Sequence, residues 1–143
     1  MILTAKEKGN LTELQCITAF YESGCRVSIP YGENSRYDFI ADIDGKLLKI
    51  QVKTSTLSED KSYIEFSCRS TRVNSTGVVN RKYTEDEIDY FCTYYDNKCY
   101  LIPIQECSTS KKLRFIAPKN GQKVGINFAK EYELLSQIQK IKG

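Results

Sequence analysis

The chain has 143 residues, of which 27% are charged and 41% apolar, and its formal net charge is +3. This length and balance fit a single globular domain over residues 1–143, which is expected to bury roughly two-thirds of its unfolded surface. No apolar run reaches the length of a membrane span, and the charged N-terminus does not resemble a signal peptide. We therefore expect an intracellular, cytoplasmic protein with no membrane partner.

The chain contains no histidine, and its cysteines are scattered without a Cys-x-x-Cys pair: Cys16, Cys25, Cys68, Cys92, Cys99 and Cys107. This pattern does not favour a zinc site, and free buried thiols are expected instead. The absence of histidine also excludes Ser-His-Asp and Cys-His catalysis. Any hydrolytic chemistry must therefore use carboxylates, amides, lysine and metal-bound water.

The first element is a predicted helix over residues 4–23 or 10–23, with a capping box at its start and Gly24 as its C-terminal stop. Within this helix Glu13 has the spacing that places it on the apolar face with Phe20. Carboxylates are rarely buried unless they are paired or bound to a metal. Glu13 is thus a candidate functional residue, although a carboxylate at the margin of the stripe could also reach solvent.

Residues 25–30 predict a short strand, and residues 36–54 then predict a β-hairpin around Asp44-Gly45. Both turn residues tolerate the positive φ that a two-residue type I′ turn requires. With this turn, Ile43 pairs with Lys46. The turn therefore fixes the register of the two strands.

Counting outward from the turn places Asp38 opposite Gln51, with Lys53 on the same face of the sheet. Leu48, Ile50 and Val52 point the other way. Cross-strand side chains are close enough for oxygens of Asp38 and Gln51 to hold one cation between them. The hairpin is thus a candidate active site, although the solvated face of an ordinary sheet edge would carry similar charges.

After the hairpin, residues 63–68 predict a further strand that continues the sheet. Residues 69–83 then form a loop or irregular ribbon that contains no acid and carries four basic residues: Arg69, Arg72, Arg81 and Lys82. Arginine, hydroxyl and backbone amide groups commonly contact nucleic-acid phosphates. This segment is a candidate phosphate-binding region, and a basic surface loop without such a role is the alternative.

The remaining residues predict four elements. These are a short helix that begins at 84–87, a hairpin over 90–104, an edge strand over 113–117 and a helix capped by Asn127. The last helix has an apolar stripe of Phe128, Tyr132, Leu135 and Ile138. It could pack within the chain or form a dimer.

Glu13 on a helix, Asp38 on one strand and Gln51-Val52-Lys53 on the next resemble the core of the PD-(D/E)XK nucleases. Over about residues 4–107 the chain is most similar to the group I intron-associated homing endonucleases of that superfamily. The segments that carry this likeness are 29–38, 51–54, 68–72, 83–91 and 100–103. The resemblance implies an α/β (α+β) fold with a restriction-endonuclease-like core, in which helices flank a central mixed sheet.

The resemblance also implies a catalytic set, a metal and partners. Glu13, Asp38, Gln51 and Lys53 would be catalytic, and Mg²⁺, with Mn²⁺ as a substitute, would bind to Asp38, Gln51, Glu13 and the Val52 backbone carbonyl. Lys53 would position or deprotonate the attacking water, or offset negative charge. The substrate would be double-stranded DNA.

The implied DNA-binding set adds Arg36 and Lys49 to the four basic residues of 69–83. Because one such site cuts one strand, a homodimer or homotetramer is expected. In a bacterial host the protein would associate with the nucleoid.

The chain departs from the superfamily pattern at two positions: Tyr37 replaces the motif proline and Gln51 replaces the usual acid. An amide oxygen can bind Mg²⁺ but contributes no negative charge. Two alternatives to a homing endonuclease therefore stay open. One is a Holliday-junction resolvase or restriction-type nuclease on the same core, and the other is a catalytically inactive DNA- or RNA-binding module.

Overall fold

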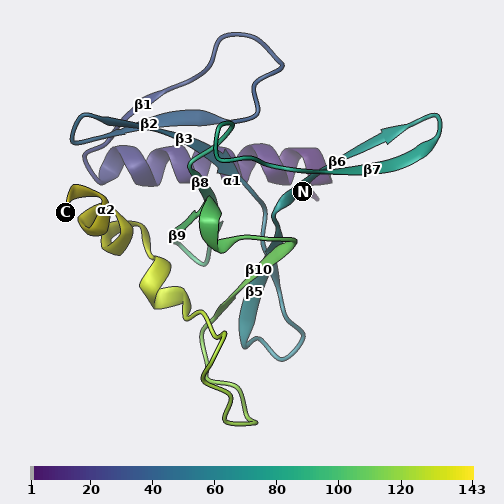
Figure 1. Ribbon diagram of the computed structural model, residues 1–143, viewed down its shortest axis with the longest axis vertical. Helices are drawn as coiled ribbons and strands as arrows, with labels where there is room; N and C mark the ends of the chain where they lie inside the picture. Colours follow the sequence, from purple (N-terminus) through teal and green to yellow (C-terminus); the bar gives the residue numbers. More distant parts are fainter. Residues whose placement is uncertain (1) are drawn as a thin grey trace.

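A computed structural model describes residues 2–143, without the side chains of residues 72–74. Its central sheet has five strands in the order β1-β2-β3-β8-β9 (Figure 1). These are β1 (Arg26–Ser28), β2 (Phe39–Ile43), β3 (Lys46–Val52), β8 (Tyr90–Tyr95) and β9 (Lys98–Pro103). The sheet is mixed, because β3 and β8 run parallel and the other neighbours are antiparallel.

Two helices, α1 (Ala5–Glu22) and α2 (Leu134–Lys142), cover one face of this sheet. Their apolar side chains, such as Phe20 and Ile138, share a buried core with Ile50 of β3. Burial of such side chains is the main stabilising contribution to a layered fold of this kind. The predicted α/β class, with a central mixed sheet flanked by helices, is confirmed.

A second, smaller sheet lies against the opposite face of β8 and β9. Its strands, in the order β10-β5-β4, are β10 (Ser110–Arg114), β5 (Tyr63–Ser67) and β4 (Thr56–Leu57). Phe91 of β8 packs here against Phe66 of β5, with ring centroids 5.9 Å apart, while the next residue, Cys92, points into the helical core. The prediction that residues 63–68 continue the central sheet is therefore wrong, because β5 pairs only with strands of the smaller sheet.

The predicted hairpin of β2 and β3 is confirmed with its register. Asp44 and Gly45 adopt φ angles of 55° and 85°, and Ile43 pairs with Lys46. The Gly45 N–H donates to the Asp42 carboxylate at 2.9 Å, which closes the turn. Leu48, Ile50 and Val52 contribute to the helical core, as predicted, so the alternate residues face the other side of the sheet.

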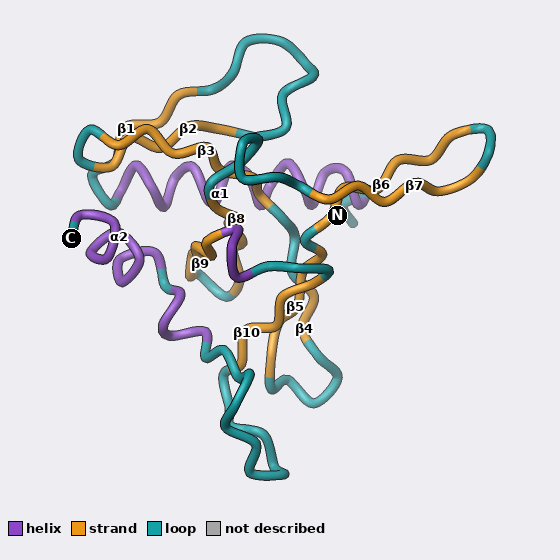
Figure 2. The backbone as a smooth tube through the Cα atoms, viewed as in Figure 1, coloured by secondary structure: helices purple, strands orange, loops and turns teal. Residues whose placement is uncertain are grey.

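The longer alternative for the first helix is confirmed, and its capping box is present between Thr4 and Glu7. Residues 69–83 form a regular antiparallel ribbon of β6 (Arg69–Asn74) and β7 (Gly77–Lys82), which extends away from the body of the molecule (Figure 2). The described side chains of β7 are all exposed. This segment is thus more ordered than the predicted loop or irregular ribbon.

Two predictions between residues 84 and 117 need correction, and a third is confirmed. Residues 84–87 form a turn rather than the start of a helix, because the chain enters β8 only two residues after Ile88. The edge strand is β10, which ends at Arg114 and so lies earlier than predicted. The hairpin over 90–104 is confirmed as β8 and β9, followed by the short 3-10 helix η1 (Ile104–Glu106).

The C-terminal helix also differs from the prediction. The 3-10 helix η2 (Ala129–Tyr132) comes first, and the Asn127 side chain accepts a hydrogen bond from the Tyr132 hydroxyl at 3.1 Å instead of capping a helix. In α2 the buried face contains Leu134 and Ile138, whereas Leu135 is 63% exposed. The helix packs within the chain, and no helix in the described part of the chain is long and apolar enough to cross a membrane.

Two glycines with opposite backbone requirements provide a test of this fold. Gly45 has a φ of 85°, a region that costs an alanine about 1–2 kcal/mol, so Gly45→Ala should destabilise the hairpin by that amount. Gly9 lies inside α1, and a Cβ there meets nothing within 4 Å, so Gly9→Ala should stabilise the fold by about 0.5–1 kcal/mol. Chemical denaturation measures both, and a shift of the same sign in both variants would contradict the assigned turn or helix.

Candidate active site

Asp38 directly precedes β2 and is fixed by two hydrogen bonds to β3. Its backbone N–H donates to the Ile50 carbonyl at 2.8 Å, and its Oδ2 accepts from the Val52 N–H at 2.7 Å. The pair Phe39–Ile50 belongs to the predicted register, and Asp38 continues it toward Gln51. Within the described part of the chain, Oδ1 of Asp38 takes no hydrogen bond.

Lys53 follows the end of β3 and is held between the central sheet and the ribbon. Its backbone N–H donates to the Cys92 carbonyl at 2.8 Å, which extends the parallel pairing with β8. Its ammonium donates to the Arg69 carbonyl at 2.9 Å and lies 5.0 Å from the centre of the Tyr83 ring. The amine is thus oriented by the first residue of β6 and by an aromatic face.

Gln51 lies between these residues and pairs with Phe91 across the parallel strands. Its side-chain nitrogen donates to the Val52 carbonyl at 3.3 Å, and the side chain is half-buried. The Gln51 amide and the Val52 carbonyl therefore lie close together, and the Val52 N–H holds the Asp38 carboxylate to the same strand. Together they form an oxygen-rich edge at the end of β3.

Glu13 reaches this edge from α1. The neighbouring residue, Thr12, contacts Thr54 through their hydroxyl oxygens, which are 3.4 Å apart, so this turn of the helix is attached to the end of β3. Burial raises the pKa of Glu13, and the negative charge of Asp38 raises it further. The predicted face of Glu13 thus brings it within electrostatic range of Asp38.

The pKa values of the ionisable residues in the site are shifted mainly by burial. Burial raises the pKa of Asp38, while the Val52 N–H and the Lys53 ammonium act in the opposite direction. Burial likewise lowers the pKa of Lys53, against the attraction of Asp38. Perturbed acids and amines that face one another are typical of functional sites, where the chemistry requires charges that the fold does not favour.

The predicted DNA-binding residues have unequal surroundings. Arg36 is surrounded by protein partners: Nε donates to Glu87 at 2.9 Å, Nη1 to Ser70 at 2.9 Å and Nη2 to the Lys82 carbonyl at 3.0 Å. Its guanidinium also lies 4.0 Å from the centre of the Tyr83 ring. Arg36 therefore joins the chain just before Asp38 to both strands of the ribbon.

The other basic residues lie on the ribbon and on β3. Arg69 has a buried Nε without a hydrogen-bond partner in the described part of the chain, and its backbone carbonyl accepts from Lys53. Arg81 is paired with Glu87 at 3.0 Å but is 65% exposed, and Lys82 is exposed. Lys49 donates to the Asp86 carbonyl. The prediction for Arg72 concerns a side chain outside the described residues.

Sequence reasoning assigned no role to Tyr83 or Glu87, which organise the surroundings of Lys53 and Arg36. Tyr83 contacts both cations, and its ring meets that of Phe91 edge to face at a centroid distance of 5.4 Å. The segment 83–91 carries part of the family resemblance, which was the available signal. Its capping-box pattern instead predicted a helix, so no role was assigned to either side chain.

The chain is similar to known proteins in both sequence and fold. Residues 3–135 match the PD-(D/E)XK endonuclease family. The chain belongs to that family. Among solved structures, a bacterial homing endonuclease, I-Ssp6803I, has a TM-score of 0.75 at 24% identity, with 98% of each chain covered. No functionally curated protein matches the chain.

The match to I-Ssp6803I confirms the fold expected from the family resemblance. In this PD-(D/E)XK chain the oxygen atoms near Asp38 are also suitable ligands for a hard divalent cation such as Mg²⁺. The oxygens of Asp38, Gln51, Glu13 and the Val52 carbonyl come from three adjacent segments, and oxygen ligands are those that Mg²⁺ prefers. These four ligands carry little negative charge, because only Asp38 and Glu13 are carboxylates.

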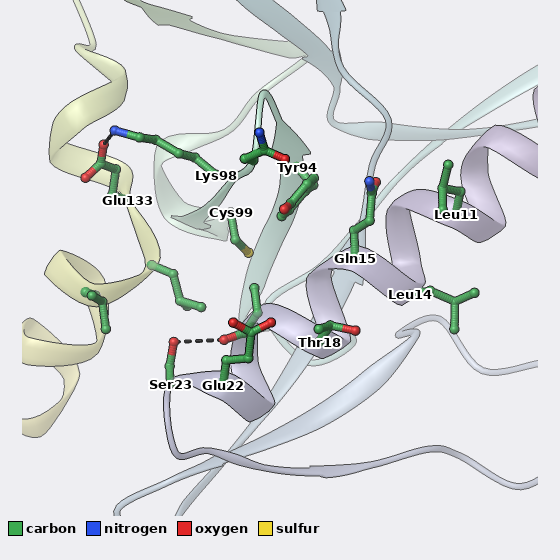
Figure 3. A pocket seen from close by; sticks show the side chains of 14 residues that line it. Leu11, Leu14, Gln15, Thr18, Glu22, Ser23, Tyr94, Lys98, Cys99 and Glu133 are labelled. Carbon is green, nitrogen blue, oxygen red and sulfur yellow. Dashed lines mark hydrogen bonds and ion pairs between the residues drawn. The ribbon is translucent and has the colours of Figure 1, made fainter.

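A groove on another part of the molecule contains none of these residues. It has a volume of about 650 Å³ and runs between α1, the β8–β9 turn and α2, where Lys98 and Glu133 form an ion pair of 2.8 Å (Figure 3). None of the predicted site residues lines it.

All six cysteines are free, as predicted, and five are buried. Cys16, Cys92 and Cys99 come from α1, β8 and β9, and their sulfur atoms lie within 4.8 Å of one another in the helical core. Cys92 and Cys99 are 3.2 Å apart. Small apolar thiols are common in protein cores, and here they fill the space between α1 and the sheet.

The perturbed pKa of Asp38 predicts a conflict between stability and function. A carboxyl group with a raised pKa stabilises the folded state below its unfolded pKa, and this contribution is lost as the pH rises through the folded pKa. At neutral pH the ionised group is thus destabilising. Asp38→Asn keeps an oxygen for the Val52 N–H and should raise Tm at pH 7 by about 2–4 °C, a gain of about 1 kcal/mol.

Thermal unfolding at several pH values tests this expectation, and the gain should shrink as the pH falls toward about 4. Asp60→Asn is the matched control. Hydrogen bonds from Ser62 and Ser58 lower the pKa of Asp60 to about 2, so its removal should reduce Tm at neutral pH. If Asp38→Asn also reduced Tm there, the carboxylate would be stabilised by its surroundings rather than penalised.

Proposed function

We propose that this protein is a Mg²⁺-dependent endonuclease of the homing type that hydrolyses phosphodiester bonds in double-stranded DNA. The observation that carries the proposal is the convergence of Asp38, Gln51 and Lys53 at the end of β3. Membership of the PD-(D/E)XK endonuclease family supports nuclease chemistry. The fold similarity to a homing endonuclease supports the more specific assignment.

Each residue has a role that follows from its surroundings. Asp38, Gln51, Glu13 and the Val52 carbonyl would hold the cation, with Mn²⁺ as a substitute. When bound, the cation polarises the scissile phosphate and lowers the pKa of a water molecule. Lys53, whose pKa is lowered by burial, is suited to orient the attacking water or to accept its proton.

DNA binding in this proposal depends on the ribbon of β6 and β7. Arg69, Arg72, Arg81 and Lys82 lie on it without an acidic neighbour in residues 69–82, and Lys49 adds positive charge on β3. The Lys53 ammonium donates to the Arg69 carbonyl, which places this arginine at the base of the ribbon beside the proposed site and supports its role in DNA binding. A two-stranded ribbon also has the width of a DNA major groove.

A double-strand break requires two active sites, because one site cuts one strand. We therefore infer that the active form contains at least two copies, as a homodimer or homotetramer. A monomer would be restricted to nicking. The substrate and the assembly can therefore be examined in the same assay.

The decisive experiment is a Mg²⁺-dependent cleavage assay on a plasmid that carries the native genomic flanks, or on a randomised-site library. Lys53→Ala and Asp38→Ala should lower the cleavage rate by about 10²–10⁴-fold. Duplex binding measured in EDTA should be retained, because neither residue belongs to the ribbon. Lys140→Ala, which removes an exposed lysine of α2, is the control and should cleave normally.

Cleavage by Lys53→Ala at the wild-type rate would refute the catalytic assignment. A preference for four-way junctions over the long duplex would instead identify a resolvase. Binding without cleavage by the wild-type protein would identify an inactive DNA-binding module. Conversion of nicked plasmid into linear plasmid reports whether two sites act together.

The ribbon makes a separate prediction about salt. Arg69→Ala and Arg72→Ala should each weaken duplex binding and reduce the slope of log K against log salt concentration by about 1, because one phosphate contact is lost. Fluorescence anisotropy at several salt concentrations measures this slope, with Lys140→Ala again as the control. An unchanged slope in both arginine variants would show that the ribbon is a basic surface element that does not bind DNA.

A further inference from the structure

The Arg36 side chain was expected to contact DNA, but its surroundings are those of a structural clamp. Each of its three nitrogens donates to a protein acceptor: Glu87, Ser70 and the Lys82 carbonyl. Its side chain is only 22% exposed, and one face of its guanidinium covers the Tyr83 ring. Little of this guanidinium is available to a phosphate group.

The partners of Arg36 belong to segments far apart in the sequence. Ser70 lies on β6, Lys82 ends β7, and Glu87 lies in the turn that leads to β8. Arg36 itself stands two residues before Asp38. A single side chain thus fixes both strands of the ribbon, at their base, to the segment that carries the catalytic carboxylate.

The same base of the ribbon orients Lys53. The Lys53 ammonium donates to the carbonyl of Arg69, the residue next to Ser70, at 2.9 Å, and it also contacts the Tyr83 ring. Arg36 holds this ring and this part of β6 through its own contacts. A displacement of the ribbon base would therefore move the acceptor that holds the amine.

From these contacts we propose that Arg36 is a positioning residue that couples the β6–β7 ribbon to Lys53, rather than a phosphate contact. The ribbon would then hold the bound DNA and the Lys53 amine in a fixed position relative to each other. This inference rests on the proposed nuclease function. It replaces the role that the sequence predicted for Arg36.

The test compares Arg36→Gln and Arg36→Lys in the full chain, with single-turnover cleavage measured at saturating DNA. Arg36→Gln should lower the rate by about 10- to 100-fold, the cost of a small misplacement of a catalytic group. The slope of log K against log salt should stay unchanged. Arg36→Lys should fail to restore the rate, because one ammonium cannot reproduce a planar fork of three donors stacked on a ring.

A phosphate contact predicts a different pattern. The salt slope would fall by about 1 in Arg36→Gln, cleavage at saturating DNA would persist, and Arg36→Lys would restore both. That result would overturn the proposal. Where Arg36→Gln does not fold, Glu87→Gln keeps the guanidinium and weakens one acceptor, and it should lower the saturated rate in the same direction without changing the salt slope.

A second measurement separates this inference from the nuclease proposal. Acylation of lysines, followed by peptide mass spectrometry, reports how accessible Lys53 is without any DNA. Arg36→Gln should increase the labelling of Lys53 several-fold and leave exposed Lys140 unchanged. Unchanged labelling of Lys53 would refute the positioning role. Increased labelling in a protein that cleaves no DNA would support it while the nuclease proposal fails.

Discussion

The geometry of the site depends on the register of one hairpin, which the turn at Asp44 and Gly45 determines. Since side chains alternate along a strand, a slip of one residue would move Gln51 and Lys53 into the helical core and expose Ile50. The apolar residues of β3 therefore enforce the same register as the turn. The Val52 N–H adds a third constraint, because it donates to the Asp38 carboxylate at the last position before the strands separate.

This constraint explains why the placement of the candidate site residues could be predicted from the sequence. The positions of Asp38, Gln51 and Lys53 follow from a local turn and a period of two. Glu13 follows from a helical period and the packing of one face. These are short-range rules, and the structure follows each of them. The free thiols were predicted from the scattered spacing of the cysteines, which contains no Cys-x-x-Cys pair.

The surroundings of the site were harder to predict, because they depend on contacts between distant segments. Residues 84–87 carry a helix-capping pattern, and Glu87 does accept a hydrogen bond from the Thr84 N–H at 3.0 Å. The helix is nevertheless replaced by a turn, since β8 must begin at Tyr90 to pair with Ile50. Similarly, β5 has the alternation of any strand, and only packing against Phe91 assigns it to the smaller sheet.

The role of Arg36 was also hard to predict from the sequence, because it depends on contacts between distant segments. Its charge and its place beside a candidate site predicted a DNA contact, but side-chain type does not reveal which acceptors the fold places around it. Three acceptors and an aromatic ring surround this guanidinium, while Arg69 keeps an unpartnered donor. An arginine near a candidate site whose nitrogens are all paired with protein acceptors is therefore a weaker candidate for a phosphate contact than its charge suggests.

The neutral side chain of Gln51 can be reconciled with the proposed chemistry through the burial of the site. Burial already raises the pKa of Asp38 and Glu13, and a third carboxylate at position 51 would add like charge to a site that penalises it. An amide supplies an oxygen without that cost. The missing negative charge would then come from the DNA phosphate, so cation and substrate would favour each other's binding. On this argument Gln51 makes metal binding depend on DNA while leaving the oxygen ligands in place.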